Sequence, residues 1–120
     1  MRVTRLISTI CLAVSLLAED VTAKAKALMK EKKFDEAIKL LEEDYAKSKS
    51  AAVKTVLADA HVANGNSLMY NEALPPMRKY PAALREFRAA LKYDGENKKA
   101  KANIDTIESI YKSMGRPVPQ

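Results

Sequence analysis

Histidine and cysteine, the residue types most often used as catalytic bases, nucleophiles and zinc ligands, are scarce in this 120-residue chain. His61 is the only histidine, Cys11 is the only cysteine, and Glu42, Glu43 and Asp44 form one short acidic run. A catalytic nucleophile needs a base beside it, and a metal site needs several converging ligands. One histidine with scattered carboxylates supplies neither set, and the three glycines lie too far apart for a phosphate-binding loop. We therefore predict that the protein is not an enzyme and uses no metal or cofactor.

The first eighteen residues differ from the rest of the chain. Arg2 and Arg5 precede an uncharged run of thirteen residues, 6–18. A positive start followed by an apolar run of this length is typical of a secretory signal peptide, and the run is short for a helix that crosses a bilayer. We predict a signal peptide at 1–18, export to the bacterial periplasm or outside the cell, and no stable membrane insertion after its removal. Cleavage after Ala23 and retention of the run as an anchor stay open as alternatives.

The charge pattern argues against a nucleic-acid partner. The formal net charge is +6, but the basic residues are interleaved with acidic ones, as in the segments KEKKFDE and DGENKKAK. A nucleic-acid surface would need a stripe of one sign and aromatic platforms for bases. Interleaved charges are instead typical of the solvated side of helices. Removal of the signal peptide would also remove Cys11, so the mature chain would hold no disulfide.

The residues after the signal peptide follow a helical period. Apolar residues recur at three- and four-residue spacing, and no segment shows the alternation of a strand. Pro75 and Pro76 end the third helical stretch, whereas Gly65 could end it or lie within it. The predicted elements are a helical hairpin at 20–48, a second hairpin at 51–93 with a long first helix and a loop at 74–79, a last helix at 96–114, and a tail at 115–120.

One phrase occurs twice, as KKFDEAIKLL at 32–41 and RKYPAALREF at 78–87. Each has a basic pair, an aromatic residue, an alanine three positions after it and a large apolar residue four positions further. This pattern resembles the second helix of the tetratricopeptide repeat, a family of stacked helical hairpins of about 34 residues each. Phe34 and Tyr80 are the matching aromatic residues, but they are 46 positions apart. About twelve extra residues must therefore precede Tyr80.

The resemblance covers 19–114 and implies an all-α fold. It implies stacked antiparallel hairpins, a tetratricopeptide-like α-solenoid of about five helices, closed by a C-terminal capping helix. Members of the family bind protein segments on the concave face that their first helices form, so we expect an adaptor of this kind. The alternative is a structural subunit that forms a homo-oligomer or docks into a larger envelope assembly.

The resemblance also indicates which residues would face a bound segment. The lysines among these residues favour an acidic segment or a terminal carboxylate as the ligand. For His61, a half-buried packing role is the alternative. The candidate peptide-binding residues are Lys26, Met29 and Lys30 from the first helix, His61 from the third, and Lys99, Asn103 and Thr106 from the last.

Overall fold

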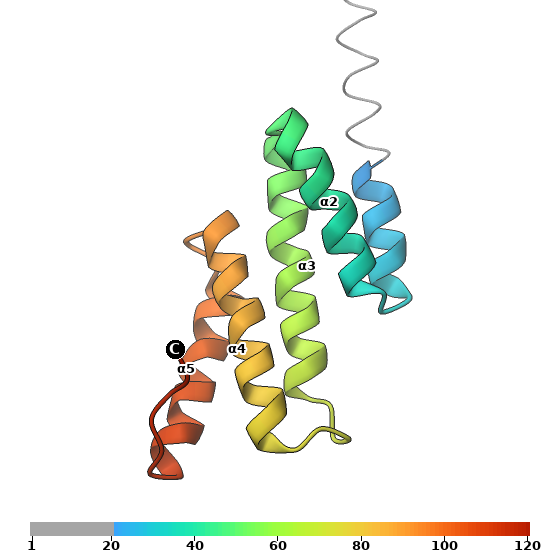
Figure 1. Cartoon of the computed structure of the whole chain (residues 1–120). Coiled ribbons are helices and arrows are strands. Elements are labelled where there is room, and N and C mark those ends of the chain that lie inside the picture. The colour runs from blue at the N-terminus through green and yellow to red at the C-terminus, as the bar shows by residue number, and fades with distance from the viewer. Residues whose placement is uncertain (1–20) are drawn as a thin grey trace, which may run out of the picture. The chain divides into compact units, whose positions relative to one another are not determined.

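The computed structural model describes residues 21–120, all of whose regular elements are α-helices (Figure 1). The all-α prediction is thereby confirmed. The predicted signal peptide and Cys11 lie outside the described residues. No helix in the described part of the chain has both the length and the apolar character to cross a membrane. The helices are a first one through 21–30, α2 at Phe34–Ser48, α3 at Ala51–Met69, α4 at Pro76–Tyr93 and α5 at Lys98–Ser113.

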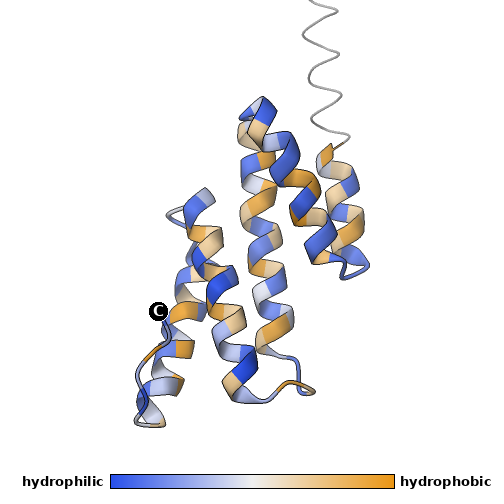
Figure 2. Cartoon of the chain, viewed as in Figure 1, coloured by the Kyte–Doolittle hydropathy of each residue, from blue (hydrophilic) through white to orange (hydrophobic). Residues whose placement is uncertain are grey.

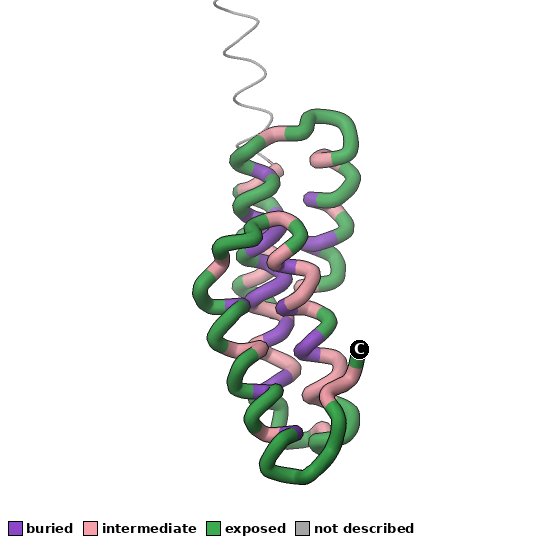
Figure 3. Tube along the Cα trace, turned by 90° about the vertical axis from the view of Figure 1, so that its left-hand side faces the viewer, coloured by how far each residue is buried: buried purple, intermediate pink, exposed green. Residues whose placement is uncertain are grey.

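The chain divides into two compact units, and the division falls within α3, between Val56 and Leu57. Along the helices of both units, apolar residues recur among polar ones (Figure 2), and buried residues recur at similar intervals (Figure 3). This is the arrangement that one buried stripe per helix produces.

In the first unit, the helix at 21–30 and α2 run antiparallel as a hairpin (Figure 1). A tight turn joins them, in which Lys32 adopts a left-handed backbone with φ 62°. The N–H of Lys33 donates to the carbonyl of Leu28 at 2.9 Å, which satisfies one of the last carbonyls of the first helix. The left-handed residue and this hydrogen bond together reverse the chain.

The end of α2 has a second left-handed residue. Lys49 caps the helix with φ 51°, and its N–H donates to the carbonyl of Tyr45. Its ammonium lies 5.1 Å from the centre of the Tyr45 ring. The buried residues of α2 are Ala37, Ile38 and Leu41, at the spacing of one helical face.

The second unit contains the remainder of α3, all of α4 and α5, and the C-terminal tail. One close contact between two helices of this unit is at Gly65 in α3. A Cβ added to Gly65 would lie 2.6 Å from Cε1 of Phe87 in α4, so any larger residue would collide with the ring. Gly65 therefore lies within the helix and provides the space that Phe87 fills. One cluster of buried residues in this unit consists of Val62, Met69, Ala83, Leu84, Phe87, Ala90, Ala100, Ile107 and Tyr111.

The loop predicted at 74–79 is wrong for its last four residues, because α4 begins at Pro76. Pro75 is the extended N-cap, as expected for a residue that precedes a proline. Pro76 occupies the first helical position, where its missing N–H has no partner to lose. Pro81 lies inside the helix, five positions after Pro76. The connection between α3 and α4 is therefore 70–75.

The tail after α5 folds back onto the second unit. Gly115 ends the helix with φ 66°, a conformation that glycine adopts without strain. Val118 then packs against the core, and the carbonyl of Pro119 accepts a hydrogen bond from Nη2 of Arg88 at 2.9 Å. The predicted tail is thus an ordered part of this unit.

Candidate functional site

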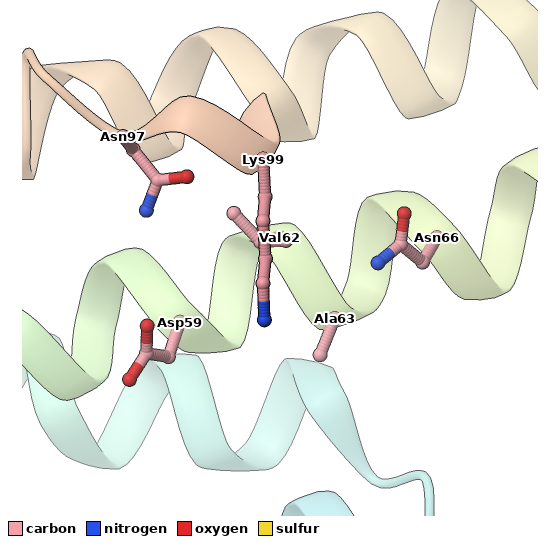
Figure 4. A pocket seen from close by; sticks show the side chains of 6 residues that line it. All are labelled: Asp59, Val62, Ala63, Asn66, Asn97 and Lys99. Atoms are coloured by element: carbon pink, nitrogen blue, oxygen red, sulfur yellow. The ribbon is translucent and has the colours of Figure 1, made fainter. Parts of the chain in front are cut away.

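A pocket of about 260 Å³ lies between α3 and the start of α5 in the second unit (Figure 4). It combines one ammonium, one carboxylate and two side-chain amides above a small apolar floor. Its lining residues are Asp59, Val62, Ala63 and Asn66 from α3, with Asn97 and Lys99 from the other side.

The α3 side of the pocket follows from helical spacing. Asp59, Val62, Ala63 and Asn66 are separated by three, four and seven positions from the first, so they lie on one face of the helix. Val62 is buried and Asp59 is exposed, which places the apolar floor beside a charged rim.

The other side of the pocket depends on the cap of α5. Asn97 is the N-cap, and its Oδ1 accepts a hydrogen bond from the N–H of Ala100 at 2.9 Å. This is the usual way in which an asparagine fixes a helix start. It leaves the Nδ2 group of Asn97 to donate elsewhere. The cap also fixes Lys99 in the first turn, from which its side chain reaches across Val62 toward α3 (Figure 4).

A hydrogen bond between two amides joins the two helices beside the pocket. Nδ2 of Asn103 in α5 donates to Oδ1 of Asn66 in α3 at 2.8 Å. Both side chains are half-buried, so the bond is partly protected from water. Because the oxygen of Asn66 is occupied, its Nδ2 group remains to donate. The bond thereby sets which way the Asn66 amide faces.

The pocket is rich in donors. Within residues 21–120, neither Lys99 nor Asp59 makes an ion pair. The ammonium of Lys99 and the Nδ2 groups of Asn66 and Asn97 are all donors, and Asp59 is the one charged acceptor. Such a set suits the carbonyls and carboxylate of a peptide. Among the described residues, no three histidine, cysteine or acidic side chains converge as a metal site would require.

Two of the residues predicted from the sequence meet at this site. Lys99 lines the pocket, and Asn103 bonds to one of its lining residues. Thr106 lies further along α5 and is exposed, but its hydroxyl donates to the carbonyl of Ala102 in its own helix. Thr106 therefore has less to offer a ligand than the sequence indicated.

His61 has the packing role that the sequence left open and does not face a ligand, because the residue is only 7% exposed. Its Nδ1 lies 2.7 Å from Oε2 of Glu86, and its ring stacks on Tyr93 at 5.7 Å between centroids. Both partners belong to α4. His61 is four residues before Gly65, on the side of α3 that packs against α4, and this spacing explains its burial.

The other predicted contacts lie in the first unit. Lys26 and Lys30 are exposed, and Met29 is half-buried, on the helix at 21–30. They do not line the pocket described above.

Sequence reasoning missed the α3 side of the pocket. Asp59 and Asn66 are seven residues apart, which is two turns of helix, and this spacing was a usable signal. Asn97 stands directly before the last helix, where an asparagine is a common N-cap. Both signals identify a face or a cap, but neither indicates which helices come together.

Comparison of the chain with protein-family models, curated proteins and solved structures gives no match.

Proposed function

We propose that this protein is a small exported adaptor, built as a tetratricopeptide-like stack of helical hairpins, that binds a segment of another protein and performs no chemistry. The repeated phrase in α2 and α4 supports the family resemblance. The segment would bind over α3 and α5, the helices that correspond to first helices of successive repeats.

The observation that carries this proposal is the convergence of three donors in one pocket. Lys99 comes from α5, Asn97 caps α5, and Asn66 comes from α3. Side-chain amides that have one hydrogen-bonding end already fixed are well suited to hold a peptide backbone in one register. A positively charged donor beside them would hold a carboxylate more strongly than a neutral donor could.

The charges in the pocket indicate which kind of peptide segment it would bind. The pocket has one cation and one anion, Lys99 and Asp59, so it has no excess positive charge to attract a run of acidic residues. A segment with one carboxylate next to backbone amides fits better. Asp59 would then accept from a backbone N–H of the segment.

The test is selection of extended peptides of about eight residues from a random library with the mature protein as bait, followed by measurement of their affinities. Lys99→Gln should weaken the binding of the selected peptides about tenfold. This is the typical contribution of a hydrogen bond to a charged group. Lys98→Gln is the matched control, because Lys98 is an exposed neighbour outside the pocket lining.

Two outcomes would contradict the proposal. Either no peptide binds better than its scrambled form, or the selected peptides bind the Lys99→Gln variant as tightly as the parent. Solution mass measured on the same sample distinguishes the alternative function, since a structural subunit would self-associate at the concentrations used.

A further inference from the structure

A second pocket, of about 280 Å³, lies at the opposite end of α5 from Asn97 and is separate from the donor-rich pocket. It is bounded by the beginning of α4, the last turns of α5 and the tail. Its lining residues are Met77, Pro81, Tyr111, Arg116, Pro117 and Pro119.

The walls of this pocket are preformed. Three of its lining residues are prolines, whose φ is fixed by the ring. The tail that carries Pro117 and Pro119 is held at two points, by Val118 in the core and by the hydrogen bond from Arg88 to the Pro119 carbonyl. A ligand would therefore lose little free energy in ordering its site.

One lining residue has a buried polar atom without a partner. Tyr111 is 2% exposed, and its hydroxyl makes no hydrogen bond within the described residues. Buried hydroxyls nearly always have a hydrogen-bond partner, and an unpaired one is unfavourable. The hydroxyl has almost no exposed surface, so it is the rest of the Tyr111 side chain that lines the pocket.

At the rim of the pocket lies an arginine that has no ion-pair partner among the described residues. The guanidinium of Arg116 donates to the thioether sulfur of Met77 at 3.4 Å, and makes no ion pair within residues 21–120. A thioether is a weak acceptor, whereas a guanidinium matches a carboxylate with two parallel hydrogen bonds. Met77 is apolar and 53% exposed, so the positive charge of Arg116 lies directly beside apolar surface.

We propose that this pocket binds an apolar group that bears a carboxylate. The apolar body lies among Met77, Pro81 and the tail prolines, and the carboxylate pairs with Arg116. The same chemistry has two sources, a free arylalkanoic acid and the C-terminal residue of a peptide chain. A cationic or neutral apolar ligand lacks the group that Arg116 would bind.

The test uses the mature protein with its methionine methyl groups labelled for NMR. The probes are 4-phenylbutanoate and its neutral amide, and a short peptide that ends in phenylalanine, with a free or an amidated C-terminus. We expect the Met77 methyl signal to shift with the acids, while the Met29 signal, from the other unit, does not move. Whichever acid binds more tightly identifies the source.

Variants test whether Arg116 binds the carboxylate. Arg116→Gln should weaken the binding of the acids about tenfold and leave the weak binding of the amides unchanged. Arg85→Gln, at an exposed arginine of α4 outside the pocket, is the matched control and should leave the binding of every probe unchanged.

The proposal is overturned if the Met77 methyl does not shift with any probe up to about 10 mM, a concentration that would reveal a binding free energy of about −3 kcal/mol. It is also overturned if acid and amide bind equally, or if Arg116→Gln binds the acids as the parent does.

Discussion

In α2, the aromatic residue of the repeated phrase is the first residue of the helix, Phe34. In α4, the matching Tyr80 lies within the helix, which begins four residues earlier at Pro76. The two helices therefore start in different ways although the phrase is the same. The residues just before the phrase decide the start, since a proline pair caps α4 and a left-handed lysine turn precedes α2.

The two helices begin differently, but residues at matching positions of the phrase are buried in both. Ala37 and Ala83 are both 0% exposed, and so are Leu41 and Phe87. Burial follows the spacing of apolar residues along the helix, and this spacing does not depend on where the helix begins.

Three positions after the end of each phrase, the two helices no longer agree. Ala90 is buried in α4, whereas Asp44 occupies the matching position of α2 and is half-buried. Asp44 is close enough to the surface to accept a hydrogen bond from the hydroxyl of Ser48 at 3.0 Å. The buried stripe is thus one residue longer in α4 than in α2.

The largest expected effect comes from removal of the large apolar residue of each phrase. Phe87→Ala should lower the free energy of unfolding by about 3–5 kcal/mol, and Leu41→Ala by about 2–5 kcal/mol. Both side chains are fully buried, so each truncation leaves a cavity. Urea denaturation of the two variants measures the losses. A loss below about 1 kcal/mol for either would mean that this residue does not occupy the equivalent core position.

Overpacking at the small residue should cost less. Ala37→Leu and Ala83→Leu should each destabilise the protein by about 1–3 kcal/mol, because both residues are fully buried and a larger side chain would overpack the core. Ala46→Leu is the control, since Ala46 lies on the exposed side of α2. If both buried variants match this control in denaturation midpoint, the equivalence of the two alanines is lost.

Gly65 should show a smaller net effect, because two terms oppose each other. Alanine at this position gains about 1 kcal/mol of helix propensity but forces a Cβ against the Phe87 ring, at a cost of about 1–3 kcal/mol. We expect Gly65→Ala to be less stable by about 1 kcal/mol. Combination with Phe87→Leu should make the alanine neutral or favourable, as measured by a double-mutant cycle. A stabilising single variant would show that the ring moves aside easily.

The smallest expected effect is at the position where the helices differ. Asp44→Ala should change the free energy of unfolding by no more than about 0.5 kcal/mol, since the hydrogen bond to Ser48 is exposed. Thermal melts of the parent and the variant are sufficient to compare them. A loss above about 1 kcal/mol would indicate that Asp44 has a buried partner.

The helices were predictable because apolar spacing is a local property of the chain. The start of α4 was not, although the rule about prolines was sound. That rule excludes Pro75 from the helix, but it allows Pro76 at the first helical position. Pro81 shows the limit of local rules more clearly. It lies inside α4 although an internal proline costs about 3 kcal/mol, because burial of residues on the same helix outweighs that cost.

The candidate site was only half predictable. Lys99 and Asn103 were found through the family resemblance, which places them on the face of the last helix. Asp59 and Asn66 belong to a face of α3 that looks merely polar in the sequence. Their role depends on the contact between Asn66 and Asn103, and a contact across 37 positions leaves no local signal.

The lysine that caps α2 has a consequence for the response of the protein to ionic strength. The left-handed backbone of Lys49 costs about 1–2 kcal/mol that glycine would not incur. Its ammonium regains part of this through the negative end of the helix dipole and the face of the Tyr45 ring, each contributing up to about 1 kcal/mol at an exposed site. Salt screens both gains but leaves the backbone cost unchanged. The end of α2 should therefore fray first as salt is added, and a glycine at this position would remove that sensitivity.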